Sequence, residues 1–274
     1  MSLIDKILIT GITDEGLVRE HNEDSIACSA ELGLLVLADG MGGHKGGEIA
    51  SAIAVDTIMQ NLATALPTIT PGHTNDKTGY SLESMAVESA IKEANLKIFE
   101  SSKNNEKYEG MGTTVVVLLF YDNRLTIAHV GDSRLYRMRE QTLEQMTRDH
   151  TLLQELVDRG FYTPKEASES LNRNLVTRAV GINDSVDIDL LEEVALADDT
   201  YLLCSDGLTD MISDDLIEDI QLNYHTNLQK MNEELIRQAN EYGGKDNISV
   251  MLAQVTKEFP ANSGWLSRFF DIFS

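Results

Sequence analysis

The chain has 274 residues, of which 42% are hydrophobic and 24% are charged, so it can bury a full hydrophobic core. It carries 22 Lys and Arg against 45 Asp and Glu, a formal net charge of −23, and so acidic a surface argues against binding to nucleic acid. The acid excess is either a solubility device or a site that concentrates cations, and composition alone favours the first.

The first predicted elements are one strand and two long helices. The apolar run "LGLLVLA" (32–38) is too short for a helix and is typical of a strand. Residues 46–66 and 81–102 repeat apolar side chains at helical spacing, so both are predicted as helices. The segment 66–80 between them contains proline and glycine and is predicted as a surface loop.

Four further strands and two further helices are predicted in the rest of the chain. The strands are 113–121, 124–130, 200–205 and 247–255, and the helices are 149–160 and 227–244. Asp122 and Asn123 predict a hairpin turn. Because the apolar runs are nearly continuous, we expect the strands to be covered on both faces. The order of elements favours an α+β sandwich in one domain, residues 1–257.

An aromatic tail, residues 258–274, follows the predicted domain. Its last ten residues contain the only tryptophan and three phenylalanines. Three interpretations remain open: the tail docks on its own core, binds a partner protein, or lies at a membrane interface. A single basic residue, Arg268, gives little support to the last of these.

The cysteines and the N-terminus bear on the compartment. Cys28 and Cys204 lie far apart without metal-ligand spacing, a usage that fits a reducing cytoplasm. Asp5 and Lys6 interrupt the N-terminal apolar run, which argues against a signal peptide. No apolar stretch approaches the ~20 residues of a membrane helix. We therefore expect a cytoplasmic chain without a transmembrane segment.

Acidic residues recur where predicted strands begin or end. The motifs are "VREHNEDS" with Glu23 and Asp24, "VLADG" with Asp39, "AHVGDSR" with Asp132, "LLCSDGL" with Asp206 and "GGKDNIS" with Asp246. Any one Asp beside a glycine is a common turn, but strand ends can bring all of them to one rim of a sheet core. Carboxylates packed together repel one another unless cations neutralise them. A ligand set made only of oxygen suits Mg²⁺, Mn²⁺ or Ca²⁺, and the bare backbone of Gly40 could add its carbonyl.

These motifs, with "DGMGGHKGGEIAS" and "EGMGTTVVV" between them, resemble in order the motifs of the metal-dependent protein serine/threonine phosphatases of the PP2C type, and "DGMGG" is similar to the bacterial branch. The resemblance runs from Val18 to Leu252. It implies a four-layer α-β-β-α sandwich with two central antiparallel sheets and a helical flap insertion, at about residues 152–181. It also implies two Mn²⁺ or Mg²⁺ ions, and a third, weaker ion.

The resemblance also implies a role for each matching residue. Asp39 is expected to bridge the two ions. Asp206 and Asp246 complete one metal site, whereas Glu23 and the Gly40 carbonyl hold the other. Asp132 is expected to share the third ion with Asp206. The remaining matches are Asp24 and Asn247 behind the ligands, and Arg19 as the residue that binds the phosphate.

The implied reaction is direct attack on phosphorus by a hydroxide that bridges the ions, while Arg19 binds two phosphate oxygens in its planar fork. Animal relatives carry a histidine directly after the Asp-Gly as the proposed general acid, and this chain has Met41 there. His44 is a candidate substitute; a loop histidine, or a water as the acid, are the alternatives. In the flap, Arg173 and Arg178 are candidate contacts for an acidic phosphopeptide.

Phosphoprotein substrates, an opposing bacterial Ser/Thr kinase and a monomeric enzyme follow from the same resemblance. Three alternatives remain: a non-catalytic pseudophosphatase, a phosphatase of a small metabolite, and a phosphatase of an anti-sigma-antagonist protein. The presence of every expected acid argues against the first. The net charge of −23 predicts a preference for basic residues around the phosphothreonine.

Overall fold

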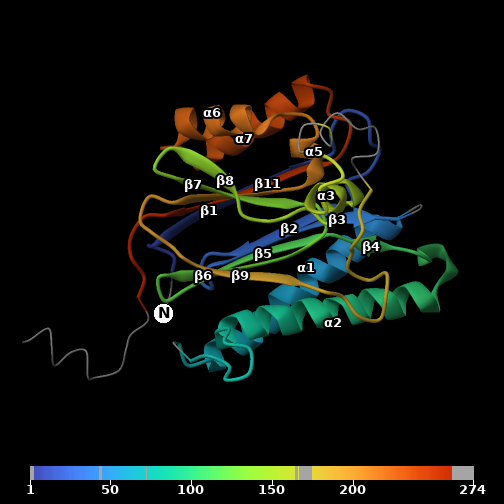
Figure 1. Cartoon of the computed structure of the whole chain (residues 1–274), viewed down its shortest axis with the longest axis horizontal. Helices are drawn as coiled ribbons and strands as arrows, with labels where there is room; N and C mark the ends of the chain where they lie inside the picture. The colour runs from blue at the N-terminus through green and yellow to red at the C-terminus, as the bar shows by residue number, and fades with distance from the viewer. Residues whose placement is uncertain (1–2, 43–44, 72, 164–165, 167–174, 261–274) are drawn as a thin grey trace, which may run out of the picture.

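The structure, a computed structural model, describes residues 3–42, 45–71, 73–163, 166 and 175–260. Two antiparallel sheets pack face to face, and a layer of helices covers the outer face of each (Figure 1). This arrangement confirms the predicted four-layer α-β-β-α sandwich.

One sheet joins strands from the two ends of the chain. Its order is β1 (Ile7–Asp14), β11 (Ile248–Val255), β10 (Thr200–Cys204), β7 (Arg134–Arg139) and β8 (Thr142–Gln145). Because β1 pairs with β11 along its whole length, the domain closes only when its first and last strands meet.

The second sheet is built from the N-terminal half and one later strand. Its order is β2 (Asp24–Ser29), β3 (Leu34–Met41), β5 (Val115–Tyr121), β6 (Arg124–Val130) and β9 (Asp189–Val194), with β4 (Gly112–Thr113) paired to the end of β3. Asp122 and Asn123, with φ of 45° and 55°, form the predicted tight turn between β5 and β6.

Four long helices form the outer layers. Helices α1 (Gly46–Ala65) and α2 (Leu82–Asn104) cover the second sheet, and α6 (Asp214–Tyr224) and α7 (Leu228–Glu241) cover the first (Figure 1). Shorter elements are η1 (Leu66–Thr68), η2 (Glu106–Tyr108), α3 (Leu152–Asp158) and α5 (Asp206–Thr209). The hydroxyls of Ser81 and Ser213 accept hydrogen bonds from backbone amides in the first turns of α2 and α6.

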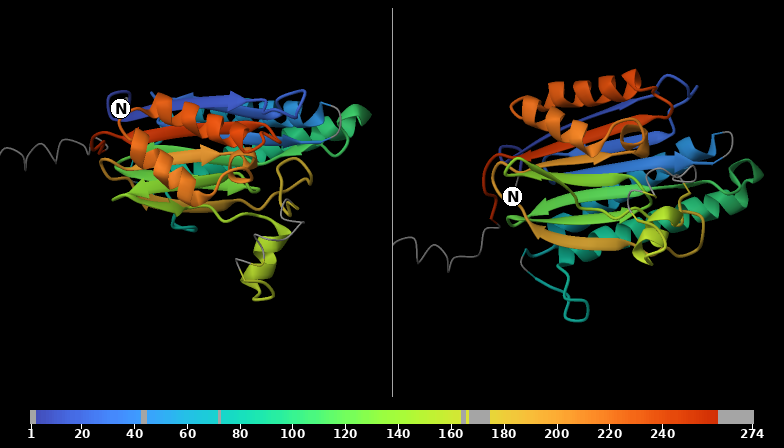
Figure 2. Two further views of the ribbon diagram at one scale, coloured as in Figure 1. Left: turned by 90° about the horizontal axis from the view of Figure 1, so that it is seen from above. Right: turned by 45° about the horizontal axis from the view of Figure 1, so that its top comes forward.

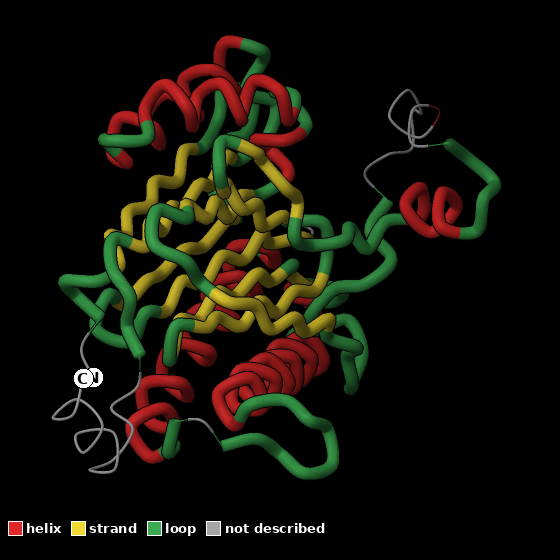
Figure 3. The backbone as a smooth tube through the Cα atoms, turned by 60° about the vertical axis from the view of Figure 1, so that its left-hand side comes forward, coloured by secondary structure: helices red, strands yellow, loops and turns green. Residues whose placement is uncertain are grey.

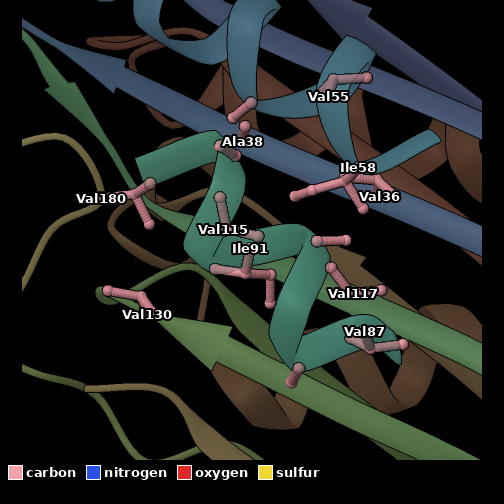
Figure 4. Close-up of a cluster of buried hydrophobic side chains, with 14 of the residues drawn as sticks. Val36, Ala38, Val55, Ile58, Val87, Ile91, Val115, Val117, Val130 and Val180 are labelled. Atoms are coloured by element: carbon pink, nitrogen blue, oxygen red, sulfur yellow. The ribbon is translucent and has the colours of Figure 1, made fainter. Parts of the chain in front are cut away.

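The core has three layers because each sheet is buried on both faces. One cluster fills the space between the second sheet and helices α1 and α2, where Val36, Val115 and Val117 meet Ile58 and Ile91 (Figure 4). A second cluster lies between the sheets, and a third lies under α6 and α7. The predicted covering of the strands on both faces is therefore confirmed, and it leaves the sheet ends as the place for polar groups.

Every predicted strand and helix is present, with ends that differ by a few residues. The sequence analysis missed β1, β2, β7, β8, β9 and α6. These strands carry interleaved polar side chains; β9, for example, reads "DLLEEV" and is only partly buried. The mixed composition of β2, β7, β8 and β9 does not stand out from a loop, and pairing with a neighbouring strand decides their structure. Strand β1, "ILITGITD", is rich in apolar and β-branched residues and could have been predicted from the sequence.

One described segment, Gly46–Thr68, is long and apolar enough to cross a membrane by length and composition alone. The expectation that no apolar stretch approaches that length is therefore wrong for this segment. Its buried residues belong to the core beneath α1 and α2, as in the core helix of a globular domain.

The segment between β8 and β9 stands away from the sandwich, with α3 at its tip (Figures 2 and 3). Its two arms are tied together at the base, where Thr151 and Val176 form a bridge and the Leu152 amide donates to the Leu175 carbonyl. A second bridge, between Thr113 and Val180, fixes the returning arm beside β4. The insertion predicted at about 152–181 therefore has a fixed base, whereas residues 164–165 and 167–174 lie outside the described residues.

Candidate active site

The predicted carboxylates converge in one pocket at the end of the sandwich. The pocket has a volume of about 470 Å³ and is lined by Arg19, Glu23, Asp39, Gly40, Met41, Gly42, Thr114, Asp132, Leu175, Val176, Asp206 and Asp246. Asp39 lies near the end of β3, Asp132 follows β6, Asp206 begins α5 directly after β10, and Asp246 precedes β11. Residues from both sheets therefore meet at one rim, as the strand-end positions predict.

Asp24 lies behind this pocket and joins the two sheets. It is paired across the ladder with Asp39, and its Oδ2 accepts hydrogen bonds from Ser205 (2.9 Å) and Ser249 (2.6 Å) of the opposite sheet. Its Oδ1 is buried without a hydrogen-bond partner among the described residues. Burial raises the pKa of Asp24 to about 6, although the two hydroxyls act against the shift.

The same cause acts on the carboxylates that line the pocket. Burial, and then the charges of neighbouring aspartates, raise the pKa of Asp39 and of Asp206 well above the ordinary value. Burial raises the pKa of Asp132 to about 6 and also raises that of Glu23. Because these carboxylates all resist ionisation, a positive charge placed among them would be strongly favoured.

Two threonines hold the backbone of Asp39 in place. The Asp39 carbonyl accepts from the Thr114 amide and from the Thr113 hydroxyl, both at 2.8 Å. The Asp39 amide donates to the Thr114 hydroxyl, which is also bonded to Ser133. The "GTT" stretch therefore fixes the strand end that presents the Asp39 side chain.

Asn247 holds the backbone of Glu23 in place. Its Oδ1 accepts from the Glu23 amide at 2.8 Å, and its Nδ2 donates to the carbonyls of Glu15 and His21. The buried amide thus ties the loop before β2 to the start of β11. Asn247 contacts the loop that carries Glu23, in agreement with a position behind the pocket.

Arg19 is the cation among the described residues that line the pocket. Its Nη2 donates to Asp246 Oδ2 at 2.6 Å, and its side chain is half exposed. This hydrogen bond, opposed by partial desolvation, raises the pKa of Arg19 above its already high value, so the guanidinium stays charged. Arg19 therefore places a planar hydrogen-bond donor, its guanidinium, at the mouth of an acidic pocket.

The part of the chain that forms this pocket also matches a known protein family. A family model described as protein phosphatase 2C matches residues 18–253. The chain belongs to the protein phosphatase 2C family. The predicted resemblance is therefore confirmed at the level of the family.

Named relatives are bacterial members of the PP2C family. The chain is 38% identical over 244 residues to the serine/threonine protein phosphatase PstP of Mycobacterium tuberculosis, covering 89% of this chain but 44% of the relative. It is 35% identical to the serine/threonine phosphatase stp of Listeria welshimeri, covering 88% of this chain and 93% of the relative. The chain thus spans less than half of PstP and nearly all of stp. A crystal structure of the PstP catalytic domain in complex with two manganese ions superposes with a TM-score of 0.78 at 36% identity, covering 92% of this chain and 99% of the other.

Glycines set how closely the segments of this PP2C domain approach. A Cβ on Gly40 would lie 2.1 Å from the Gly47 carbonyl oxygen, and one on Gly207 would lie 1.9 Å from the Asn247 carbonyl oxygen. Side chains are absent there because the first turn of α1 packs directly on the end of β3, and α5 packs on the residue before β11. These contacts explain why glycines follow Asp39 and Asp206.

The pocket wall includes residues that the sequence analysis missed. Leu175 and Val176, from the base of the flap, line the pocket beside the carboxylates. No motif in the sequence marks them, because their position depends on the bridge from Val176 to Thr151. Arg178 pairs with Asp189 at 2.8 Å and is not among the residues that line this pocket. His44 and Arg173 lie outside the described residues.

A second titratable group, His129, His150 and Asp189, lies outside the pocket lining, with potential ligand atoms within 4.8 Å of one another. The two rings stack with centroids 4.6 Å apart. The Gly131 amide donates to His150 Nδ1, so the neutral ring carries its proton on Nε2, 3.4 Å from Asp189. Burial lowers the pKa of both histidines, to about 4 for His150. His129 Nε2 lies 2.8 Å from the Arg148 carbonyl oxygen, whereas His150 Nε2 is buried without a hydrogen-bond partner among the described residues.

Proposed function

We propose that the chain hydrolyses phosphoserine and phosphothreonine in proteins by direct attack of water on phosphorus, without a covalent enzyme intermediate. The observation that carries the proposal is the pocket that gathers carboxylates from both sheets around Arg19. Family membership supports the same reaction, and relatives are named as serine/threonine phosphatases.

The pocket fits divalent cations because its donors are oxygens that repel one another when ionised. We propose that Mn²⁺ or Mg²⁺ is held by Glu23, Asp39, the Gly40 carbonyl, Asp206 and Asp246, and that Asp132 shares a third, weaker ion with Asp206. Asp24 and Asn247 then position the ligands from behind. Bound cations would supply a coordinated water whose pKa is lowered toward neutrality. The manganese-bound PstP structure supports this choice of ion.

Arg19 orients the substrate in this proposal. Its guanidinium can donate two parallel hydrogen bonds to phosphate oxygens, which fixes the phosphorus next to the carboxylate pocket. The ion pair with Asp246 keeps the guanidinium at the pocket mouth. Leu175 and Val176 add apolar surface to the pocket on the flap side. His44 remains a candidate general acid.

A cysteine nucleophile has no support in the structure. Cys204 is fully buried, and burial raises its pKa to about 12. Partial desolvation also raises the pKa of Cys28, which lies at the surface. Both thiols are thus kept protonated, the opposite of what an attacking thiolate requires.

The wider setting is also proposed. Substrates are phosphoproteins, the opposing enzyme is a bacterial Ser/Thr kinase, and the chain acts as a monomer in the cytoplasm. Two free cysteines support a reducing compartment, and the names of the bacterial relatives support the substrate class.

The test is phosphate release from a phosphothreonine peptide with Mn²⁺, with a chelator, and with an Asp39→Asn variant. We expect release to require Mn²⁺ and to fall by several orders of magnitude in the variant. Asp56→Asn, an exposed position on α1, is the matched control and should retain full activity. A folded, Mn²⁺-loaded chain that releases no phosphate would refute the proposal and favour a non-catalytic role.

A further inference from the structure

A second pocket lies at the end of the sandwich away from the carboxylates. It has a volume of about 500 Å³ and is lined by Leu3, Glu31, Leu32, Leu66, Pro67, Ile69, Pro71, Glu83, Leu119, Phe120, Tyr121, Asp122 and Phe259. We call it the tail groove. Strand β6 runs between the two sites. It begins at Arg124, just after the turn beside the groove, and Asp132 of the carboxylate pocket follows the other end of the strand. Seven residues of strand span about 23 Å.

The tail groove contains a buried carboxylate with one oxygen that has no partner among the described residues. Glu83 is 4% exposed, and its Oε2 has no hydrogen-bond partner among the described residues. Leaving a buried acceptor unsatisfied is unfavourable. The described residues that line the groove include three acids and neither Lys nor Arg. The groove therefore fits a ligand that combines apolar bulk with a hydrogen-bond donor, preferably a cation.

The described chain leads directly into this groove. Phe259 is 1% exposed, and its ring packs edge-on against Phe120 with centroids 6.0 Å apart. Its amide donates to Asn123 at the turn between β5 and β6. The residues that follow, 261–274, include Trp265, three phenylalanines and the single cation Arg268. Trp265 is six residues beyond Phe259, within about 20 Å along an extended chain.

We propose that residues 261–274 dock in the tail groove of their own chain. The aromatic rings cover the apolar lining formed by Leu66 and Ile69, and the Arg268 guanidinium donates to the Glu83 carboxylate. Composition supports this occupant, because the segment offers the aromatic area and the cation that the groove lacks. Position supports it as well, because the segment begins two residues after Phe259, which lines the groove.

The test uses Trp265, the only tryptophan, as the probe in the full-length chain. We expect its fluorescence emission to be blue-shifted and protected from acrylamide, relative to the same chain in urea. Ile69→Asp, in the groove, should shift the emission to the red and remove the protection. Leu96→Asp, on the exposed face of α2, is the matched control and should change neither quantity. Phosphate release should be the same in both variants, because the groove lies away from the carboxylates.

The ion pair is tested by Glu83→Gln, Arg268→Gln and the double variant. We expect each single change to increase acrylamide quenching and the double change to add little, because both remove the same contact. Arg268 lies beyond the described core, so its variant keeps the test valid if Glu83→Gln or Ile69→Asp fails to fold.

Three outcomes would overturn the proposal. One is a Trp265 emission in the native chain equal to that in urea. The second is a blue shift that disappears on dilution, which would mean docking into a second copy. The third is a blue shift that requires added phospholipid vesicles, which would mean that the tail binds a membrane surface.

Discussion

The free-energy cost of ionising a buried carboxylate of the pocket can be measured at Asp132. In the absence of metal, this side chain is 7% exposed, and burial raises its pKa from 3.8 to about 6. Since one pKa unit corresponds to about 1.4 kcal/mol, ionising Asp132 at pH 7 lowers the free energy of unfolding by about 3 kcal/mol. Replacing it with the neutral, isosteric asparagine removes this penalty. We expect Asp132→Asn to stabilise the metal-free chain by about 2–3 kcal/mol.

The pH dependence gives the sign of the effect. The folded state binds the Asp132 proton more tightly than the unfolded state does, so the penalty is absent below the unfolded pKa of 3.8. It grows as the pH rises and is complete above about 6. The gain from Asp132→Asn should therefore be largest at pH 7 and vanish toward pH 4. With excess Mn²⁺ the order should reverse, because the variant loses a proposed ligand.

The assay is urea unfolding of both proteins in chelator at pH 7 and pH 5, repeated with Mn²⁺. Asp149→Asn is the matched control, because Asp149 accepts two hydrogen bonds from Nε and one from Nη2 of Arg134. Removing that partner should destabilise the chain by about 1–3 kcal/mol. If metal-free Asp132→Asn is less stable than the unaltered chain at pH 7, the reasoning that burial penalises the ionised carboxylate is wrong.

Four further outcomes are expected. Arg19→Lys should lower kcat/KM by roughly 10- to 100-fold in a steady-state assay with the phosphothreonine peptide, since the proposed bidentate contact with phosphate would be worth about 1.5–3 kcal/mol. Gly207→Ala should lower the free energy of unfolding by about 1–3 kcal/mol in urea, because its Cβ would overlap the Asn247 carbonyl. Burial holds the pKa of His150 near 4, below its ordinary 6.5. The stability that its neutral ring contributes should therefore be complete above pH 6.5 and be lost as the pH falls toward 4. Urea unfolding across this pH range would contradict this if the His150→Gln variant lost as much stability with acid as the unaltered chain. Peptides with basic residues beside the phosphothreonine should be cleaved faster than acidic ones at low salt, and equal rates would count against steering by the net charge of −23.

The acidic motifs were predictable because their residue types are tied to the ends of strands. Asp39 and Asp206 each follow an apolar run and precede a glycine, a local pattern that the sequence displays directly. The same holds for the long helices, whose apolar residues repeat at the helical period. The fold class could be predicted because buried strands and amphipathic helices leave strong signals.

The missed features depend on contacts between distant segments. Leu175 and Val176 reach the pocket only through the bridge at the flap base. Likewise, Asp24 is held by Ser205 and Ser249, about 180 and 225 residues away in the chain. Local propensity carries no information about such pairs. Partly buried strands such as β9 were missed for the same reason, since a neighbouring strand decides their structure.

The joining of both sheets at one rim has a consequence during protein synthesis. Glu23 and Asp39 lie near the start of the chain, whereas Asp246 precedes the last strand, which pairs with the first. A ribosome must therefore complete nearly the whole domain before the last proposed ligand can join the others. Nascent chains should thus remain inert toward phosphoproteins until Asp246 and β11 have joined the fold, and products truncated before Asp246 should lack the proposed activity.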